Sequence, residues 1–186
     1  MLNDARVPSS RVPIVANDQT GTTTREWFRF FDALSALLAF GRARFSDSTS
    51  PVFVANTPRL LPIGQTTFNQ GMSVAASRVT VATPGTYTLA LTLQLANANA
   101  SNADWFMVWM RINGVDQPSS AARAAVPVLS FGTLVTTFYA DFAAGDYFEL
   151  YGLSRLGYAV VSTTAASGVP AYPATPGLTL IATQIL

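Results

Sequence analysis

The chain has 186 residues, 49% hydrophobic and 11% charged, with a formal net charge of +1, which favours one compact domain with an appendage and excludes a strongly basic surface for nucleic acid. It contains no Cys and no His, and all eleven basic residues are Arg, which excludes zinc sites, thiol catalysis, Ser-His-Asp triads and Schiff-base lysines. We therefore expect a non-enzymatic protein, without cofactor, metal or small-molecule substrate, whose weakly polar surface is covered by other protein subunits.

Residues 1–22 are predicted to form an extended N-terminal arm. Val7-Pro8 and Val12-Pro13 oppose a helix, because proline removes a backbone donor and favours extended geometry in the residue before it. Two interpretations remain open: a disordered terminus of the isolated subunit, or an arm that becomes ordered against a neighbouring subunit. Apolar and arginine side chains support the second, since arginine pairs well with carboxylates. The residues expected to hold the neighbour are Arg6, Val7, Arg11, Val12 and Ile14.

An amphipathic anchoring helix is predicted over residues 23–41. Thr23 and Glu26 have the spacing of a capping box, and Gly41 is placed where a left-handed residue ends a helix. Large apolar side chains at i, i+4, i+7 and i+11 form one stripe. The stripe packs either on the chain's own β-domain or on helices of other chains, and we favour the second. The helix residues expected in the anchor are Arg25, Trp27, Arg29, Phe30, Phe31, Leu34 and Leu38.

The composition changes after the helix. Residues 42–57 are predicted to form a hinge and a first strand, and residues 58–186 a jelly-roll domain. Thr86–Leu95 alternate polar and apolar side chains as a half-buried strand does. Short strands separated by turns, with no helical period, are typical of a sandwich or barrel. The predicted strands are Val52–Ala55, Arg59–Ile63, Ser73–Ala76, Arg78–Ala82, Gly85–Ala96, Trp105–Ile112, Val126–Ser130, Leu134–Phe142, Tyr147–Leu153, Ala159–Ser162 and Leu178–Ile185.

Several motifs in residues 66–186 resemble the C1q/TNF-like jelly roll. They are Phe68-Asn69-Gln70-Gly71, the Pro84-Gly85-Thr86-Tyr87 strand start, Val108–Gly114 with its Asn-Gly turn, Ala144–Leu150 with its Gly-Asp strand start, and the closing strand Leu178–Ile185. The resemblance implies a ten-stranded β-sandwich that trimerises about a hydrophobic axis. The residues expected at that axis or in the sandwich core are Tyr87, Leu89, Leu91, Trp109, Phe138, Tyr147 and Phe148.

The N-terminal part, about residues 5–40, is similar to the opening segments of small virion proteins of tailed phages. The similarity rests on Arg11-Val12-Pro13, Gly21 and the run Arg25–Phe31. It implies a location in the virion, with assembly in the host cytoplasm. It also implies the major capsid protein or other virion proteins as partners.

Two other features of the β-domain could indicate a binding site, one for calcium and one for a sugar. The aspartates Asp104, Asp116, Asp141 and Asp146 are too dispersed for a calcium loop and are interpreted as capping turns. The aromatic residues could form a sugar-binding platform but are interpreted as core or trimer axis. They are Trp105, Phe106, Trp109, Phe131, Phe138, Tyr139 and Tyr147.

The sequence therefore predicts a homotrimeric structural protein of a phage virion, most concretely a capsid cement or decoration protein, or a head fiber. Its arm and helix would anchor it while the jelly roll projects. No stretch reaches the ~18 consecutive apolar residues of a membrane span, so no membrane partner is expected. The alternative is a receptor- or carbohydrate-binding module of a tail fiber or tail-associated protein.

Overall fold

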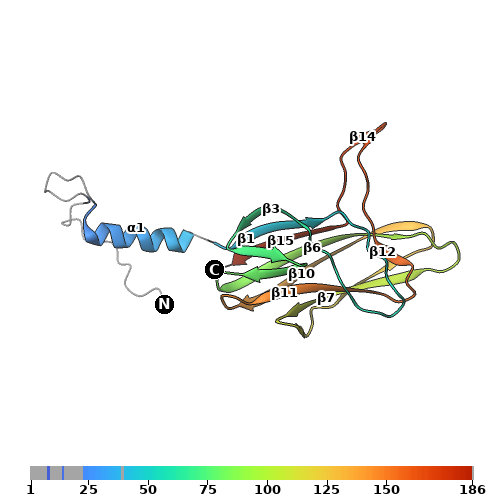
Figure 1. The fold of residues 1–186 in the computed structure, drawn as a ribbon, viewed down its shortest axis with the longest axis horizontal. Coiled ribbons are helices and arrows are strands. Elements are labelled where there is room, and N and C mark those ends of the chain that lie inside the picture. Colours follow the sequence, from blue (N-terminus) through green and yellow to red (C-terminus); the bar gives the residue numbers. More distant parts are fainter. Residues whose placement is uncertain (1–7, 9–13, 15–22, 39, 186) are drawn as a thin grey trace. The chain divides into compact units, whose positions relative to one another are not determined.

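The structure is a computed structural model that describes Pro8, Ile14 and residues 23–38 and 40–185. The chain divides into two units, Met1–Phe40 and Gly41–Leu186 (Figure 1). The first unit contains a helix, and the second is built almost entirely of antiparallel strands. The predicted arm residues Arg6, Val7, Arg11 and Val12 lie outside the described residues.

Helix α1 spans Arg25–Leu38 and carries Glu26 in its first turn, where a carboxylate is favourable beside the free backbone N–H groups. It begins two residues after the predicted start and ends three residues before Gly41. With 14 residues it is too short to cross a bilayer, and the described part of the chain holds no helix that could.

Two antiparallel sheets form the sandwich, and one short hairpin stands outside it. Sheet 1 has the order β10-β6-β15-β1-β3, with β12 also paired to β6. Sheet 2 has the order β4-β5-β11-β7-β8, with β2 paired to β11 and β9 paired to β7. The strands of sheet 1 are β1 (Arg42–Asp47), β3 (Gln65–Gln70), β6 (Gly85–Asn97), β10 (Ser130–Phe142), β12 (Ala159–Val161) and β15 (Leu178–Ile185). Those of sheet 2 are β2 (Arg59–Leu60), β4 (Met72–Ala75), β5 (Arg78–Val81), β7 (Asp104–Ile112), β8 (Val115–Asp116), β9 (Ala122–Val126) and β11 (Tyr147–Ser154).

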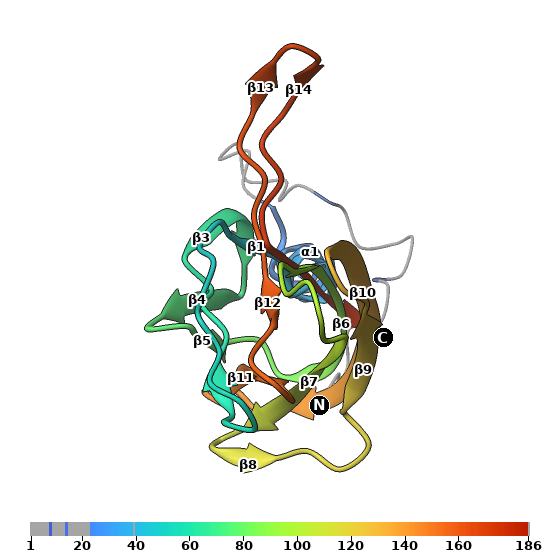
Figure 2. The same cartoon turned by 90° about the vertical axis from the view of Figure 1, so that its right-hand side faces the viewer.

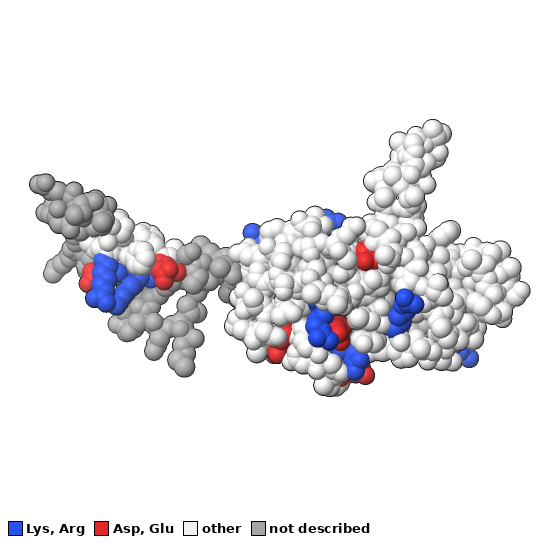
Figure 3. All heavy atoms as spheres, in the orientation of Figure 1, with Lys and Arg blue, Asp and Glu red and all other residues white. Residues whose placement is uncertain are grey.

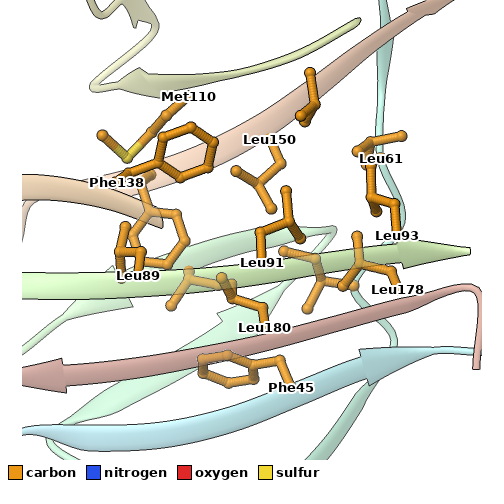
Figure 4. Close-up of a cluster of buried hydrophobic side chains, with 14 of the residues drawn as sticks. Phe45, Leu61, Leu89, Leu91, Leu93, Met110, Phe138, Leu150, Leu178 and Leu180 are labelled. Carbon is orange, nitrogen blue, oxygen red and sulfur yellow. The ribbon is translucent and has the colours of Figure 1, made fainter. Parts of the chain in front are cut away.

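This architecture confirms the predicted fold class, a jelly-roll β-sandwich preceded by a helix. The alternation predicted for β6 is observed residue by residue, with Tyr87, Leu89 and Leu91 fully buried. Phe138 of β10 is buried beside Leu89 in the same sheet, and Phe148 of β11 is buried in sheet 2. The core therefore lies between the sheets, and Figure 4 shows side chains of β1, β6 and β15 meeting those of β7 and β11.

The structure differs from the predicted hinge at residues 42–50. Arg42–Asp47 form β1, which lies inside sheet 1 between β15 and β3. Its burial alternates at first, with Ala43 and Phe45 facing the core and the arginines facing outward. The arginines gave the segment a polar composition, but in a strand every second side chain can face solvent. The sandwich therefore starts at Gly41.

Gly41 has a different role from the predicted helix cap. A Cβ at this position would lie 1.9 Å from the hydroxyl oxygen of Tyr87, so only glycine fits. The Tyr87 hydroxyl donates a hydrogen bond of 2.7 Å to the Thr83 carbonyl, and burial raises its pKa. The backbone of Gly41 is in turn bonded to Gln184, whose N–H donates to the Gly41 carbonyl at 2.7 Å. The glycine thus fixes the entry of the chain into the sandwich.

Other predicted strands differ in extent. Val52–Ala55 is not a strand, although Phe53 is buried and packs edge-on against Phe106. The predicted Val126–Ser130 strand is divided, because residues 127–129 form the connection between β9 and β10. Strand β3 was not predicted, and it pairs with β1 with a shift in register between Arg44 and Phe45.

A projecting hairpin was also not predicted. Strands β13 (Ser167–Gly168) and β14 (Ala171–Tyr172) pair with each other, and Thr164 pairs with Thr175 nearer the sandwich. The base is held by β6, since the Ser162 N–H donates to the Gln94 carbonyl and the Gln94 N–H donates to the Gly177 carbonyl. Figures 1 and 2 both show the hairpin rising from the sandwich, away from β7 and β11.

Candidate interaction surfaces

The outer face of sheet 2 is charged, and two of its arginines, Arg78 and Arg111, are paired with carboxylates of the same face. Arg78 donates two hydrogen bonds to one carboxylate oxygen of Glu149, at 3.2 and 3.0 Å, and its guanidinium lies 3.8 Å from the ring centre of Tyr147. Arg123 stacks on Trp105 at 5.5 Å. Such pairs satisfy cation and ring on the same chain. Much of the charged and aromatic surface of this face therefore has its contacts within the chain.

A second cluster on the same face joins Arg111, Asp116, Trp109 and Tyr151. The Trp109 indole N–H donates to Asp116 at 2.7 Å, and the Arg111 Nε lies 3.0 Å from the same oxygen. Arg111 also lies 4.7 Å from the ring centre of Tyr151. Hydrogen bonding with Tyr151 and the charge of Asp116 raise the pKa of the Arg111 guanidinium. Trp105 and Trp109, two of the aromatic residues interpreted from the sequence as core or trimer axis, thus lie on this outer face and have partners within the chain.

The outer face of sheet 1 is different, because its three longest strands carry no charge there except at one corner. We call the outward residues of β6, β10 and β15, without Asp141, the uncharged face. On it Phe131 is 83% exposed, Val135 70% and Tyr139 70%. Its members are Thr86, Thr88, Ala90, Thr92, Gln94 and Ala96 of β6, Phe131, Thr133, Val135, Thr137 and Tyr139 of β10, and Thr179, Ile181, Thr183 and Ile185 of β15.

The registers place these residues in continuous rows. Val135 lies beside Thr92, which lies beside Thr179, and in the next row Ile181 lies beside Ala90. Charged groups only border the face, with Arg42 and Arg44 on β1 and Asp141 near the end of β10. In Figure 3 the charged atoms of the sandwich gather mainly at its lower edge, on the side of sheet 2. A continuous uncharged surface with exposed aromatic and branched side chains is typical of a subunit contact.

The predicted axis or core residues divide between these regions. Tyr87, Leu89, Leu91, Phe138 and Phe148 are buried between the sheets. Trp109 and Tyr147 are half-buried on the outer face of sheet 2 instead. The uncharged face itself was missed, since its threonines and alanines are unremarkable until the registers place them side by side.

Helix α1 presents a second apolar surface within its own unit. Trp27, Phe30 and Phe31 pack ring against ring, with centroids 5.5 to 5.7 Å apart. Phe31 and Leu34 are exposed, and Phe28 is 63% exposed. Arg25 and Arg29 are exposed beside them, and the exposed Ile14 accepts a 2.9 Å hydrogen bond from the Thr24 N–H. Leu38 ends the helix. All the helix residues predicted to belong to the anchor therefore lie on α1.

Asp104 is the centre of a buried hydrogen-bond network and does not form a surface site. Its carboxylate accepts hydrogen bonds from the Ser154 hydroxyl at 2.7 Å and from four backbone N–H groups, those of Trp105, Leu156, Tyr158 and Ala159. Burial alone would raise its pKa, but these donors outweigh burial and lower it. Asp104 thus ties the start of β7 to the connection between β11 and β12.

The other aspartates have different partners. Asp146 accepts from the Ala143 N–H at 2.7 Å and from Asn113 at 2.8 Å, as a turn cap does, and these bonds lower its pKa. Asp116 belongs to the Trp109 cluster, and Asp141 pairs with Thr86. The described residues contain no group of three side chains suited to a metal ion.

Asp104→Asn is expected to lower the free energy of unfolding by about 3 kcal/mol, because an amide nitrogen would face N–H donors that the carboxylate oxygen now satisfies. The pKa of Asp104 is lower in the folded chain, so the carboxylate stabilises the fold at neutral pH and this contribution is lost as pH falls through the folded pKa. Urea unfolding from neutral to acidic pH measures both effects. The exposed Asp141→Asn is the control, and an equal loss in both variants would contradict a special role for Asp104.

A groove of about 330 Å³ opens between β10 and the residues around β8. Met110 and Phe138 form its apolar floor, Gln117 and Tyr139 line it, and Asp141 is the one charged residue in its lining. A single carboxylate without a second acid or base partner does not form a catalytic pair.

Comparison with known proteins shows similarity in fold only. No family model matches the chain, and no curated protein matches it. Eiger TNF from S. frugiperda superposes with a TM-score of 0.52 at 9% identity, covering 80% of this chain and 94% of that one. Murine APRIL at pH 5.0 gives a TM-score of 0.49 at 10% identity, with 78% and 99% covered. The C1q/TNF-like jelly roll expected from the sequence is therefore the observed fold.

Proposed function

We propose that the chain is a non-enzymatic structural protein of a tailed-phage virion that forms a homotrimer and acts as a capsid cement or decoration protein, or as a head fiber. The observation that carries the proposal is the contrast between the outer faces of the two sheets. Sheet 2 pairs its own charges and rings, whereas the uncharged face leaves Phe131, Val135 and Tyr139 open to solvent in a single chain.

The trimer follows from this contrast together with the fold. Copies of one chain usually assemble with rotational symmetry, so that every copy makes the same contacts. In such an assembly the uncharged face would be covered in all copies. The C1q/TNF-like jelly roll fits a trimeric, non-enzymatic protein. Each chain would then turn the charged face of sheet 2 to solvent.

The virion assignment is supported by the first unit. The proposal rests on the resemblance of the motifs in residues 5–40 to the opening segments of small phage virion proteins, and on α1, which exposes Phe28, Phe31 and Leu34. Three such helices on one trimer would act together, so that modest single contacts give firm attachment. A subunit that binds only the assembled shell also stabilises that shell by mass action. The major capsid protein or another virion protein would be the partner.

Light scattering on the purified chain tests the trimer. Three chains of 19.8 kDa give about 59 kDa, and this mass is expected throughout the micromolar range because obligate interfaces commonly bury more than ~2,000 Å². A mass near that of one chain would refute the trimer.

Immunogold labelling of intact virions with an antibody to the chain tests the location. Label over the head is the expected result. Label confined to fiber tips would instead favour the receptor- or carbohydrate-binding alternative.

A further inference from the structure

The hairpin β13–β14 has features of a contact element that lacks its partner in the single chain. Residues 162–177 contain no charged side chain, and Val169 at the tip is 93% exposed. Tyr172 is exposed as well, and every residue from 164 to 175 except Ser167 is exposed. An isolated two-stranded hairpin is only marginally stable in water. Its exposed apolar tip indicates that a protein surface covers it.

The position of the hairpin indicates what covers it. It leaves sheet 1 between β12 and β15, which pair with successive parts of β6, the central strand of the uncharged face. Figures 1 and 2 show it rising on the side away from sheet 2. It therefore stands on the side of the molecule through which copies of the chain are proposed to meet.

The length of the hairpin is sufficient for it to reach a neighbouring copy on that side. Each limb, such as residues 164–169, extends roughly 20 Å at about 3.3 Å per residue. Sheets that pack face to face lie only about 10 Å apart. A hairpin of this length, on the side where the copies meet, can reach past the contact plane and lie along the neighbouring subunit. Since neither the hairpin nor the uncharged face carries charge, their contact leaves no charge buried without a partner.

We propose that the hairpin β13–β14 of each copy packs on a neighbouring copy of the same chain and clasps the trimer. This proposal depends on the proposed trimer, and it assigns the hairpin to the contact between its subunits. Val169 and Tyr172 supply its apolar contacts, and Thr164 with Thr175 closes its base.

Photo-cross-linking tests the clasp directly. A benzophenone amino acid at Val169, in complexes assembled from a mixture of ¹⁴N and ¹⁵N chains, should give covalent dimers and trimers on a denaturing gel. Mass spectrometry should find cross-linked peptides that carry both labels. The same amino acid at Val115, an exposed valine of β8 in sheet 2, is the control and should give none. Cross-links at Val169 only within one chain, or none at all, would overturn the clasp.

A shortened hairpin tests its contribution to assembly. Thr164 and Thr175 exchange both backbone hydrogen bonds, so an Asn-Gly turn can replace residues 165–174 without disturbing the base. The variant should keep the β circular dichroism of the parent, while the dissociation constant of the trimer rises at least ~10-fold. Val169→Asp should act in the same direction and Val115→Asp should not. An unchanged dissociation constant in a trimeric parent would refute the clasp alone, whereas a monomeric parent would refute the trimer.

Discussion

Replacing Val135 and Ile181 by arginine is expected to convert the trimer into folded monomers. Both side chains point outward from sheet 1, in adjacent rows of the uncharged face, so neither change touches the sandwich core. In the trimer each arginine would be buried without a partner, which costs roughly 3–5 kcal/mol per charge. The dissociation constant should therefore rise at least ~1,000-fold, since each 1.4 kcal/mol is a factor of ten. Light scattering gives the mass, and far-ultraviolet circular dichroism reports whether the jelly roll is intact.

The matched control is Val115→Arg, which adds the same charge at a 64% exposed valine of sheet 2. It should leave the trimer unchanged. If the double variant were still a trimer, the uncharged face would not be the subunit contact, and another surface would have to hold the copies together.

Trp27→Ala combined with Phe31→Ala is expected to abolish attachment to virions while leaving the jelly-roll trimer intact. The centres of the two rings lie 5.5 Å apart on α1, and Phe31 remains exposed in the single chain. Aromatic anchors of this kind commonly contribute about 2 kcal/mol or more each to binding, so attachment should weaken at least ~100-fold. Virions that lack the protein, incubated with either form, give the bound fraction by quantitative gel analysis.

Asp32→Ala is the control, since it removes an exposed carboxylate from the same helix. It should bind as the parent does. Unfolding of the β-domain by the double variant would show that the helix belongs to the core of its own chain, which is the first of the two interpretations that the sequence left open. Full attachment would show that the anchor lies elsewhere.

Local patterns in the sequence predicted much of the sandwich. The alternation in β6 placed Tyr87, Leu89 and Leu91 on one face, and that face is the core. The last strand was predicted with the bounds Leu178–Ile185 that it has. A strand that is buried on one side shows a period of two in its own residues, whatever its partners are.

Features that depend on distant parts of the chain could not be predicted in this way. Strand β1 owes its existence to β15, which lies more than a hundred residues away, and its arginines gave it the composition of a linker. The pair formed by Arg78 and Glu149 likewise joins residues 71 positions apart. The hairpin around Val169 lacks alternation, and only Gly168 and Pro170 mark its turn. The uncharged face is a property of three strands and their two registers together, and of no single segment.

The place of β1 in sheet 1 has a mechanical consequence for an anchored protein. Force that pulls on the first unit enters the sandwich at Gly41 and runs along β1. β1 is hydrogen-bonded on both sides, to β15 and to β3, and these bonds lie across the strand. A pull along β1 therefore loads both rows of bonds in shear at once, instead of opening them one by one as at a peeled edge. If the first unit is the anchor, as proposed, a pull on the jelly roll would enter through a strand that is paired on both sides and not through a free edge strand.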